Sequence, residues 1–159
     1  MSLTIRAARP SEAGLILDFV RELADYEHLL HEVAASVEDI DAALFGANPR
    51  AFCDIAEWDG QPAGIALWFY NFSTFRGRHG LYLEDLFVRP EFRGNGIATS
   101  LMRNLAKRCV DEDLGRFEWW VLNWNEPAIK FYRSIGALPM NEWTVQRVTG
   151  DALRALAES

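Results

Sequence analysis

Residues 81–101 read LYLEDLFVRPEFRGNGIATSL, and this stretch decides the fold. It begins as an apolar strand, which Pro90 ends because proline cannot donate a ladder hydrogen bond. Gly94 and Gly96 follow, and a helical pattern begins at Ile97. Glycines let the backbone approach a ligand, and the free N–H groups of a first helical turn carry about half a positive charge. The stretch therefore predicts a phosphate-binding loop between a strand and a helix.

Two common phosphate-binding loops do not fit this sequence. A Walker loop ends in Gly-Lys-Ser/Thr, and this loop has no lysine. The dinucleotide fingerprint needs a third glycine, early in a parallel unit, whereas this loop lies in the middle of the chain. What remains is the pattern Arg93-x-x-Gly96-x-Ala98. Taken alone, this pattern is also compatible with an ordinary glycine turn before a helix.

Composition and charge limit the class of protein. A chain of 159 residues, half of them hydrophobic, predicts a single packed domain over residues 1–159. The net charge of −7 without a basic tract argues against nucleic-acid binding, and the apolar runs are too short to span a bilayer. Neither the two cysteines nor the three histidines show metal-ligand spacing, so no metal is expected. We expect a reduced, cytoplasmic protein that does not bind membranes.

Periodicity and turn signals predict the element order β-α-α-β-β-β-α-β-α-β, followed by a helical tail from Asp151. A capping box of Ser36 and Asp39 begins the second helix, and Gly46 ends it. This order predicts an α/β (α+β) fold, with a mixed, strongly twisted central sheet of about six to seven strands and helices on both faces. The predicted strands cover residues 3–8, 51–58, 63–70, 81–88, 117–122 and 143–148. A polar loop is predicted over residues 71–79.

A second motif lies downstream, in the segment NWNEPAIKFYRSIGA at residues 123–137. It resembles the GNAT acetyltransferase segment Asn-x-x-Ala/Ser-x-x-x-Tyr-x-x-x-Gly-Phe/Ala. The loop described above resembles the pyrophosphate loop of the same superfamily, Arg/Gln-x-x-Gly-x-Gly/Ala. The residues at the matched positions of the second motif are Asn125, Ala128, Tyr132, Gly136 and Ala137.

Within the GNAT superfamily, WNEP at residues 124–127 and YLED at residues 82–85 resemble the diamine (spermidine/spermine) and thialysine acetyltransferases. The resemblance covers nearly the whole chain. It implies a GNAT fold with a β-bulge near Glu84, and direct transfer of an acetyl group from acetyl-CoA to a primary amine. The expected substrate is small and cationic, either a diamine or polyamine or a lysine-like amino acid. Enzymes of this kind are usually dimers, so a homodimer is expected.

The resemblance also implies site residues. An alkylamine of pKa about 10.4 is protonated at neutral pH and must lose a proton before it attacks. Glu84 matches an acid implicated in water-mediated deprotonation of the amine, and Tyr132 matches the general acid near the CoA sulfur. The implied cofactor-binding residues are Leu86, Phe87, Val88, Arg93, Gly94, Asn95, Gly96, Ile97, Ala98, Thr99, Asn125 and Ala128. The implied amine-side residues are Tyr26, Glu27, Glu84, Asp85 and Trp143.

Two other functions stay open on the sequence. The chain is also compatible with an acetyltransferase of peptide or protein amines, or with a GNAT-like module that binds CoA without turnover. The acidic set of Glu27, Glu84 and Asp85 favours a small dication. The presence of both Tyr132 and Glu84 favours catalysis, because a module that only binds CoA needs the loop but not the acid.

Overall fold

The computed structural model describes all 159 residues, and the chain divides into two compact units, Met1–Leu122 and Asn123–Ser159. The first unit contains a five-stranded sheet of order β1-β2-β3-β4-β5. Its strands are β1 (Leu3–Ala7), β2 (Phe52–Trp58), β3 (Gln61–Ser73), β4 (Arg78–Val88) and β5 (Phe117–Trp119). Its α-helices are α1 (Ala13–Tyr26), α2 (Val37–Phe45) and α3 (Ile97–Asp111). The second unit contains α4 (Glu126–Ser134) and α5 (Gly150–Glu158).

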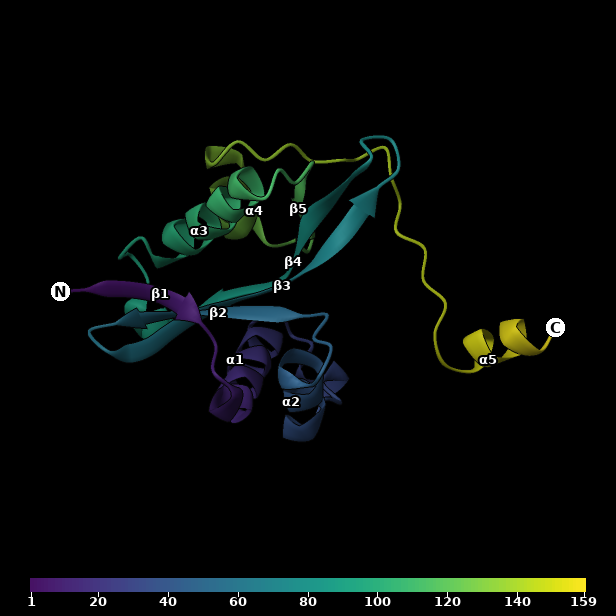
Figure 1. Ribbon diagram of the computed structural model, residues 1–159, viewed down its shortest axis with the longest axis horizontal. Coiled ribbons are helices and arrows are strands. Elements are labelled where there is room, and N and C mark those ends of the chain that lie inside the picture. The colour runs from purple at the N-terminus through teal and green to yellow at the C-terminus, as the bar shows by residue number, and fades with distance from the viewer. The chain divides into compact units, whose positions relative to one another are not determined.

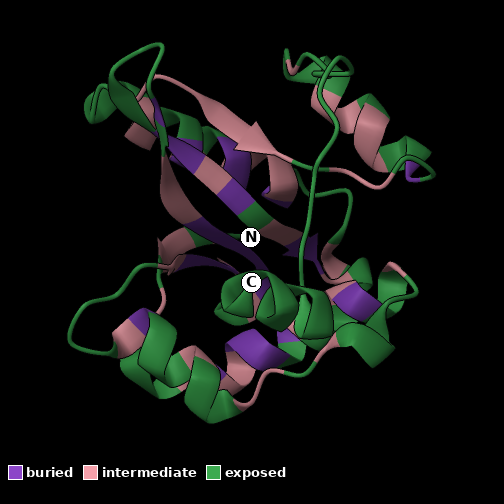
Figure 2. Cartoon of the chain, turned by 90° about the vertical axis from the view of Figure 1, so that its right-hand side faces the viewer, coloured by how far each residue is buried: buried purple, intermediate pink, exposed green.

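The sheet of the first unit is mixed and has helices on both faces, as predicted. The first four strands pair antiparallel in chain order, whereas β4 and β5 are parallel. Helices α1 and α2 cover one face and α3 covers the other (Figure 1). Figure 2 shows the buried residues concentrated in the sheet and on the sides of these helices that face it. The sheet is therefore the centre of the core and holds β4 in place between two helical layers.

Each helical layer is fixed by an apolar stripe in the sequence. On the α1 face, Ile16 and Phe19 pack with Ile55 and Ile65 of the sheet in one cluster. On α3, Ile97, Leu101 and Leu105 are fully buried, whereas Cys109, one turn further along the same stripe, is only partly buried. These residues recur every three or four positions, so they lie on one side of each helix.

The local signals at α2 are confirmed. The Asp39 amide donates to Ser36 Oγ at 3.1 Å, and the Ser36 amide donates to Asp39 Oδ2 at 2.9 Å. The helix ends at Gly46, whose amide donates to the Ala42 carbonyl. The capping box thus pairs backbone amides that the helix itself leaves unpaired, and Gly46 donates the last helical hydrogen bond before the chain becomes extended.

The structure corrects two predictions of strand content. Residues 71–79 were predicted to be a polar loop, but the β3–β4 ladder continues to Ser73 and Arg78 and leaves only a short turn. Antiparallel pairing continues there although most of the paired side chains are polar or exposed. The predicted strand at residues 143–148 is absent, so the sheet has five strands rather than six to seven. Apolar alternation forms a strand only where a neighbouring strand pairs with it, and this segment belongs to no ladder.

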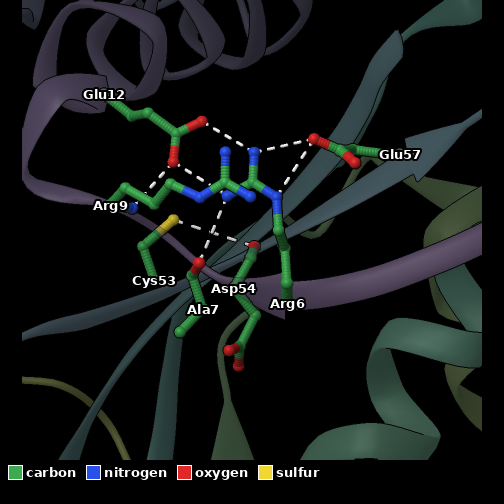
Figure 3. Close-up of polar contacts among 7 residues, drawn as sticks. All are labelled: Arg6, Ala7, Arg9, Glu12, Cys53, Asp54 and Glu57. Atoms are coloured by element: carbon green, nitrogen blue, oxygen red, sulfur yellow. Dashed lines mark hydrogen bonds and ion pairs between the residues drawn. The ribbon is translucent and has the colours of Figure 1, made fainter. Parts of the chain in front are cut away.

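One half-buried ionic network ties the start of the chain to the sheet. Arg6 of β1 donates two hydrogen bonds of 2.8 Å to the carboxylate of Glu12, and it also bonds Glu57 of β2 at 2.7 and 3.0 Å (Figure 3). The hydrogen bonds from Arg6, reinforced by the Arg9 amide, lower the pKa of Glu12 to about 2, although burial opposes this shift. Arg6 has a raised pKa, chiefly because it donates to Glu12. The network thus joins β1, β2 and the turn that precedes α1.

Glu12→Gln should lower the free energy of unfolding by about 1–3 kcal/mol at pH 7, because Arg6 loses one charged partner of a half-buried pair. The folded-state pKa of Glu12 lies below its ordinary value, so the stabilisation is present above about pH 4.5 and is lost as the pH falls toward 2. Urea unfolding of the wild type and the variant at pH 7 and pH 3 measures this difference. The matched control is Glu142→Gln, which removes an exposed carboxylate. An equal difference between wild type and Glu12→Gln at both pH values would contradict the assignment.

Candidate active site

The loop between β4 and α3 has the conformation that the sequence predicts. Gly94 and Gly96 have φ angles of +83° and +73°, in the left-handed region that favours glycine. No heavy atom lies within 4 Å of where a Cβ would stand at either position, so the glycines are required by backbone conformation and not by packing. Gly96 caps α3, whose first-turn amides have no acceptor within the helix. The loop can therefore surround an anion with backbone N–H groups.

Beside this loop, β4 has an unpaired edge. β5 pairs with β4 only from Leu81 to Leu83, so the segment from Glu84 to Val88 has a strand neighbour on the β3 side alone. The Arg89 amide donates to Ala63 of β3 at 2.8 Å. Backbone groups alternate in direction along a strand, so those of Leu86 and Val88 face the unpaired edge. Leu86 and Val88 are predicted cofactor-binding residues, and in this direction their backbone amides can donate to a ligand at the edge.

A β-bulge lies at Glu84, as the family resemblance led us to expect. Leu83 pairs with Trp68 and Asp85 pairs with Leu67, so Glu84 has no opposite residue on β3. In a regular strand Leu83 and Asp85 would share a face. The bulge instead places Asp85 on the α1 face, with Phe87 and Leu67 of the core cluster. Glu84 itself is exposed.

Three predicted amine-side carboxylates interact on this face of β4. Burial, together with the negative charges of Glu84 and Glu27, raises the pKa of Asp85 to about 7. Burial also raises the pKa of Glu27. None of the three carboxylates forms an ion pair with a cation of the protein. The arrangement can therefore accept positive charge from a ligand.

The C-terminal end of α1 carries Tyr26 and Glu27 to this face. The helix ends in a Schellman motif: the Leu29 amide donates to Ala24 at 2.7 Å and the His28 amide donates to Asp25 at 3.1 Å. His28 occupies the left-handed position with φ +61°. The negative end of the helix dipole thus lies beside Glu27 and adds to the attraction for a cation.

Arg93, predicted to contact the cofactor, has a partner within the protein that sequence reasoning missed. Its Nε donates to the Val88 carbonyl at 2.9 Å, and its guanidinium lies 5.4 Å from the centre of the Tyr26 ring. Phe87, also predicted to contact the cofactor, has a side chain that is buried in the core, so only its backbone is available. Ile97, the first residue of α3, also has a buried side chain, so only its backbone can meet the cofactor.

The second unit carries the remaining predicted residues. Asn125 caps α4, with its side chain accepting from the Ala128 amide at 3.5 Å. Ala128 and Tyr132 are four residues apart and share one side of α4, which ends before Gly136 at φ +94°. Trp143 is exposed and lies outside any helix or strand, which corrects its predicted position on a strand. The roles proposed for these four residues stay predictions.

No cluster of three or more His, Cys, Asp or Glu residues is arranged to hold a metal ion. None of the helices combines the length and the apolar character needed to cross a membrane. Cys53 and Cys109 are both free, and burial raises the pKa of each thiol.

Comparison with known proteins identifies relatives over the whole chain. The model of the acetyltransferase (GNAT) family matches residues 17–137. A thialysine N-epsilon-acetyltransferase of Sus scrofa is 38% identical over 98% of each chain. L-ornithine N5-acetyltransferase NATA1 of Arabidopsis thaliana is 38% identical over 79% of this chain and 52% of its own. An integron cassette protein from the mobile metagenome of V. cholerae superposes with a TM-score of 0.82 at 30% identity, covering 100% of this chain and 99% of that one.

Asp85→Asn should stabilise the protein relative to the wild type, and this stabilisation should be larger at pH 8 than at pH 5. The folded-state pKa of Asp85, about 7, lies above the ordinary value of 3.8, so the folded protein holds a proton that the unfolded chain releases. Wild-type stability from this group is therefore lost as the pH rises from about 4 to 7. The gain from Asp85→Asn should grow between pH 5 and pH 8, by at most about 3 kcal/mol. Urea unfolding at both pH values measures it.

Asp41→Asn, which removes an exposed carboxylate of α2, is the matched control and should show no such growth. If Asp85→Asn changed stability equally at pH 5 and pH 8, Asp85 would not be the group that titrates.

Proposed function

The chain belongs to the acetyltransferase (GNAT) family, and we propose that it moves the acetyl group of acetyl-CoA directly to a primary amine of a small cationic substrate. The observation that carries the proposal is the set of three carboxylates, Glu27, Glu84 and Asp85, which lack a protein cation and lie beside the unpaired edge of β4. The relatives agree with it, since both thialysine and ornithine are amino acids with a terminal side-chain amine. Diamines and polyamines share this chemistry.

The residues of the first unit fit acetyl-CoA, the acetyl donor of GNAT acetyltransferases. The diphosphate suits the amides from Gly94 to Thr99, where two glycines leave the backbone uncovered at the positive end of α3. The amides of Leu86 and Val88 suit the acetyl carbonyl and the pantetheine arm, because they lie on an edge that no strand occupies. The co-substrate supplies the activated acetyl group. Asn125 and Ala128 complete the proposed cofactor set.

The carboxylates perform two tasks in this proposal. Glu27 and Asp85, with Tyr26 and Trp143, bind the cationic substrate, and the charge of Asp85 depends on pH close to neutrality. Glu84 takes the proton from the attacking ammonium, directly or through one water, because it is the exposed member of the set. A substrate with two ammonium groups can then keep one charge bound while the other nitrogen is deprotonated.

Tyr132 is proposed to return a proton to the sulfur as the thiol leaves. A free thiol has a pKa near 8.5 and a tyrosine hydroxyl near 10, so the transfer is close to balanced and benefits from a positioned donor. The support for this role is the spacing of Asn125, Ala128 and Tyr132 in the family segment, all on α4 or its cap.

We also propose a homodimer in the cytoplasm. Many large apolar side chains of the second unit are exposed, and contiguous exposed apolar surface often marks an interaction site. They are Trp124, Ile135, Leu138, Met140, Trp143, Val145, Val148, Leu153 and Leu156. A second copy of this chain is the proposed partner, and two free cysteines agree with a reducing compartment.

A panel of amines should separate this proposal from its alternatives. Thiol release from acetyl-CoA should be selective for thialysine, ornithine, lysine, putrescine or spermidine over monoamines and basic peptides. Glu27→Gln should raise the KM for the preferred amine about tenfold with little change in the KM for acetyl-CoA, because one uncompensated charge is removed. The matched control is Glu38→Gln on α2, which should leave both KM values unchanged. Preference for a basic peptide would favour a protein-modifying enzyme instead.

Tyr132→Phe should lower kcat by about 10²- to 10⁴-fold and leave the affinity for acetyl-CoA nearly unchanged, because only the acidic hydroxyl is lost. Steady-state kinetics and calorimetric titration with acetyl-CoA measure the two quantities. Tyr70→Phe is the matched control: that hydroxyl bonds Glu112 at 2.6 Å and should affect stability alone. Equal loss of turnover and affinity, or loss of neither, would refute the role of Tyr132.

A further inference from the structure

Arg93 joins three parts of the site that the proposed function treats separately. It is the first residue of the loop pattern, and its side chain turns back from the loop toward β4. The Nε–H bonds the Val88 carbonyl at 2.9 Å. The guanidinium carbon lies 5.4 Å from the ring centre of Tyr26 and 5.5 Å from that of Phe87. Strand end, loop and the C-terminal end of α1 therefore meet at one side chain.

The Val88 carbonyl is on the unpaired edge of β4, because its neighbour Arg89 directs its amide toward β3. The pantetheine arm carries both amide donors and carbonyl acceptors, but the diphosphate proposed to lie at the loop, next to the end of β4 at Val88, offers only acceptor oxygens. An unpaired acceptor on the strand would repel them and would lose its own hydrogen bond to water when the site fills. Arg93 removes this conflict, since it pairs the carbonyl and leaves the Val88 amide as the group that faces a ligand.

We propose that Arg93 is a positioning residue with two separable functions, an inference that rests on the proposed acetyl transfer. Its Nε–H pairs the Val88 carbonyl, so that the end of the strand edge presents donors to acetyl-CoA. Its guanidinium holds the Tyr26 ring in place on the amine side by a cation–π contact. The side chain thereby couples the cofactor loop to the amine pocket without contacting the reacting atoms.

Glutamine can reproduce one of the two interactions of Arg93 but not the other. The Nε of arginine and the Nε2 of glutamine are separated from Cα by the same number of bonds, so both can donate to the same carbonyl. Glutamine lacks the guanidinium, however, and cannot form the cation–π contact with Tyr26. Methionine has nearly the same length and forms neither interaction. Arg93→Gln and Arg93→Met therefore separate the two functions.

Calorimetric titration with acetyl-CoA tests the first function. Arg93→Met should weaken binding of acetyl-CoA about three- to tenfold, the effect of losing one hydrogen bond, whereas Arg93→Gln should change it less than about twofold. The control is Arg89→Met: Arg89 contacts Glu22 and the Phe19 ring, and its loss should lower stability without this difference in affinity. Equal affinity of Arg93→Gln and Arg93→Met for acetyl-CoA would overturn the first function.

Amine kinetics test the second function. Both Arg93 variants should raise the KM for the preferred amine about two- to fivefold, the scale of an exposed cation–π contact. In a Tyr26→Leu background, Arg93→Gln should have no further effect on that KM. The second function would be overturned if the single Arg93 variants left the KM for the amine unchanged. It would also be overturned if Arg93→Gln raised that KM as much in the Tyr26→Leu background as in the wild type. If the wild type turned over no amine, the proposed function would fail, and the acetyl-CoA titrations would still decide the role at Val88.

Discussion

The site depends on β4 being paired along one edge only for part of its length. On its β3 side the ladder continues from Arg78 to Val88 and holds the strand in the core. On its other side, pairing with β5 ends at Leu83. An unpaired strand edge is ordinarily a liability, because its backbone donors and acceptors invite association with another chain. Here the unpaired length coincides with the bulge at Glu84 and leads directly into the glycine loop, so the backbone groups of this edge are left open to a ligand.

Two helix ends of opposite polarity adjoin this strand. The positive end of α3 follows the loop at Gly96, and the negative end of α1 lies beside Glu27. One end suits the diphosphate of a cofactor, and the other suits an ammonium group. The bulge contributes by placing Asp85 on the α1 face, away from the α3 face that Leu83 occupies. Positive partial charge thus lies at the loop, and the carboxylates lie at the α1 face. This separation makes the net charge of −7 compatible with an anionic co-substrate.

Local signals in the sequence predicted most of the first unit because short-range physics determines them. The capping pair of Ser36 and Asp39 and the glycine loop before Ile97 are examples in which a few neighbouring residues suffice. The prediction of a strand at residues 143–148 was wrong because a strand also needs a neighbouring strand to pair with, and no local pattern reveals one. The prediction of a loop at residues 71–79 was wrong for the converse reason. There β3 and β4 stay paired as far as Ser73 and Arg78, beyond the end of the apolar pattern.

The candidate site was predictable to a similar extent. The family motifs located the loop and the acidic residues near Glu84, but the face on which Asp85 lies depends on the bulge, which comes from the pairing of β4 with β3. The bond from Arg93 to the Val88 carbonyl was not predictable from the pattern alone, because it depends on which way the strand edge faces. Such directions follow from tertiary structure and are not encoded in any one segment.

The uncompensated carboxylates of Glu27, Glu84 and Asp85 also bear on how a turnover ends. Acetylation converts an ammonium into a neutral amide, so the product of the proposed reaction carries one positive charge fewer than the substrate. The carboxylates then lose part of the attraction that held the ligand, while their mutual repulsion returns. The reaction therefore weakens its own product complex. The same charges that select the substrate favour departure of the product, without any movement of the protein.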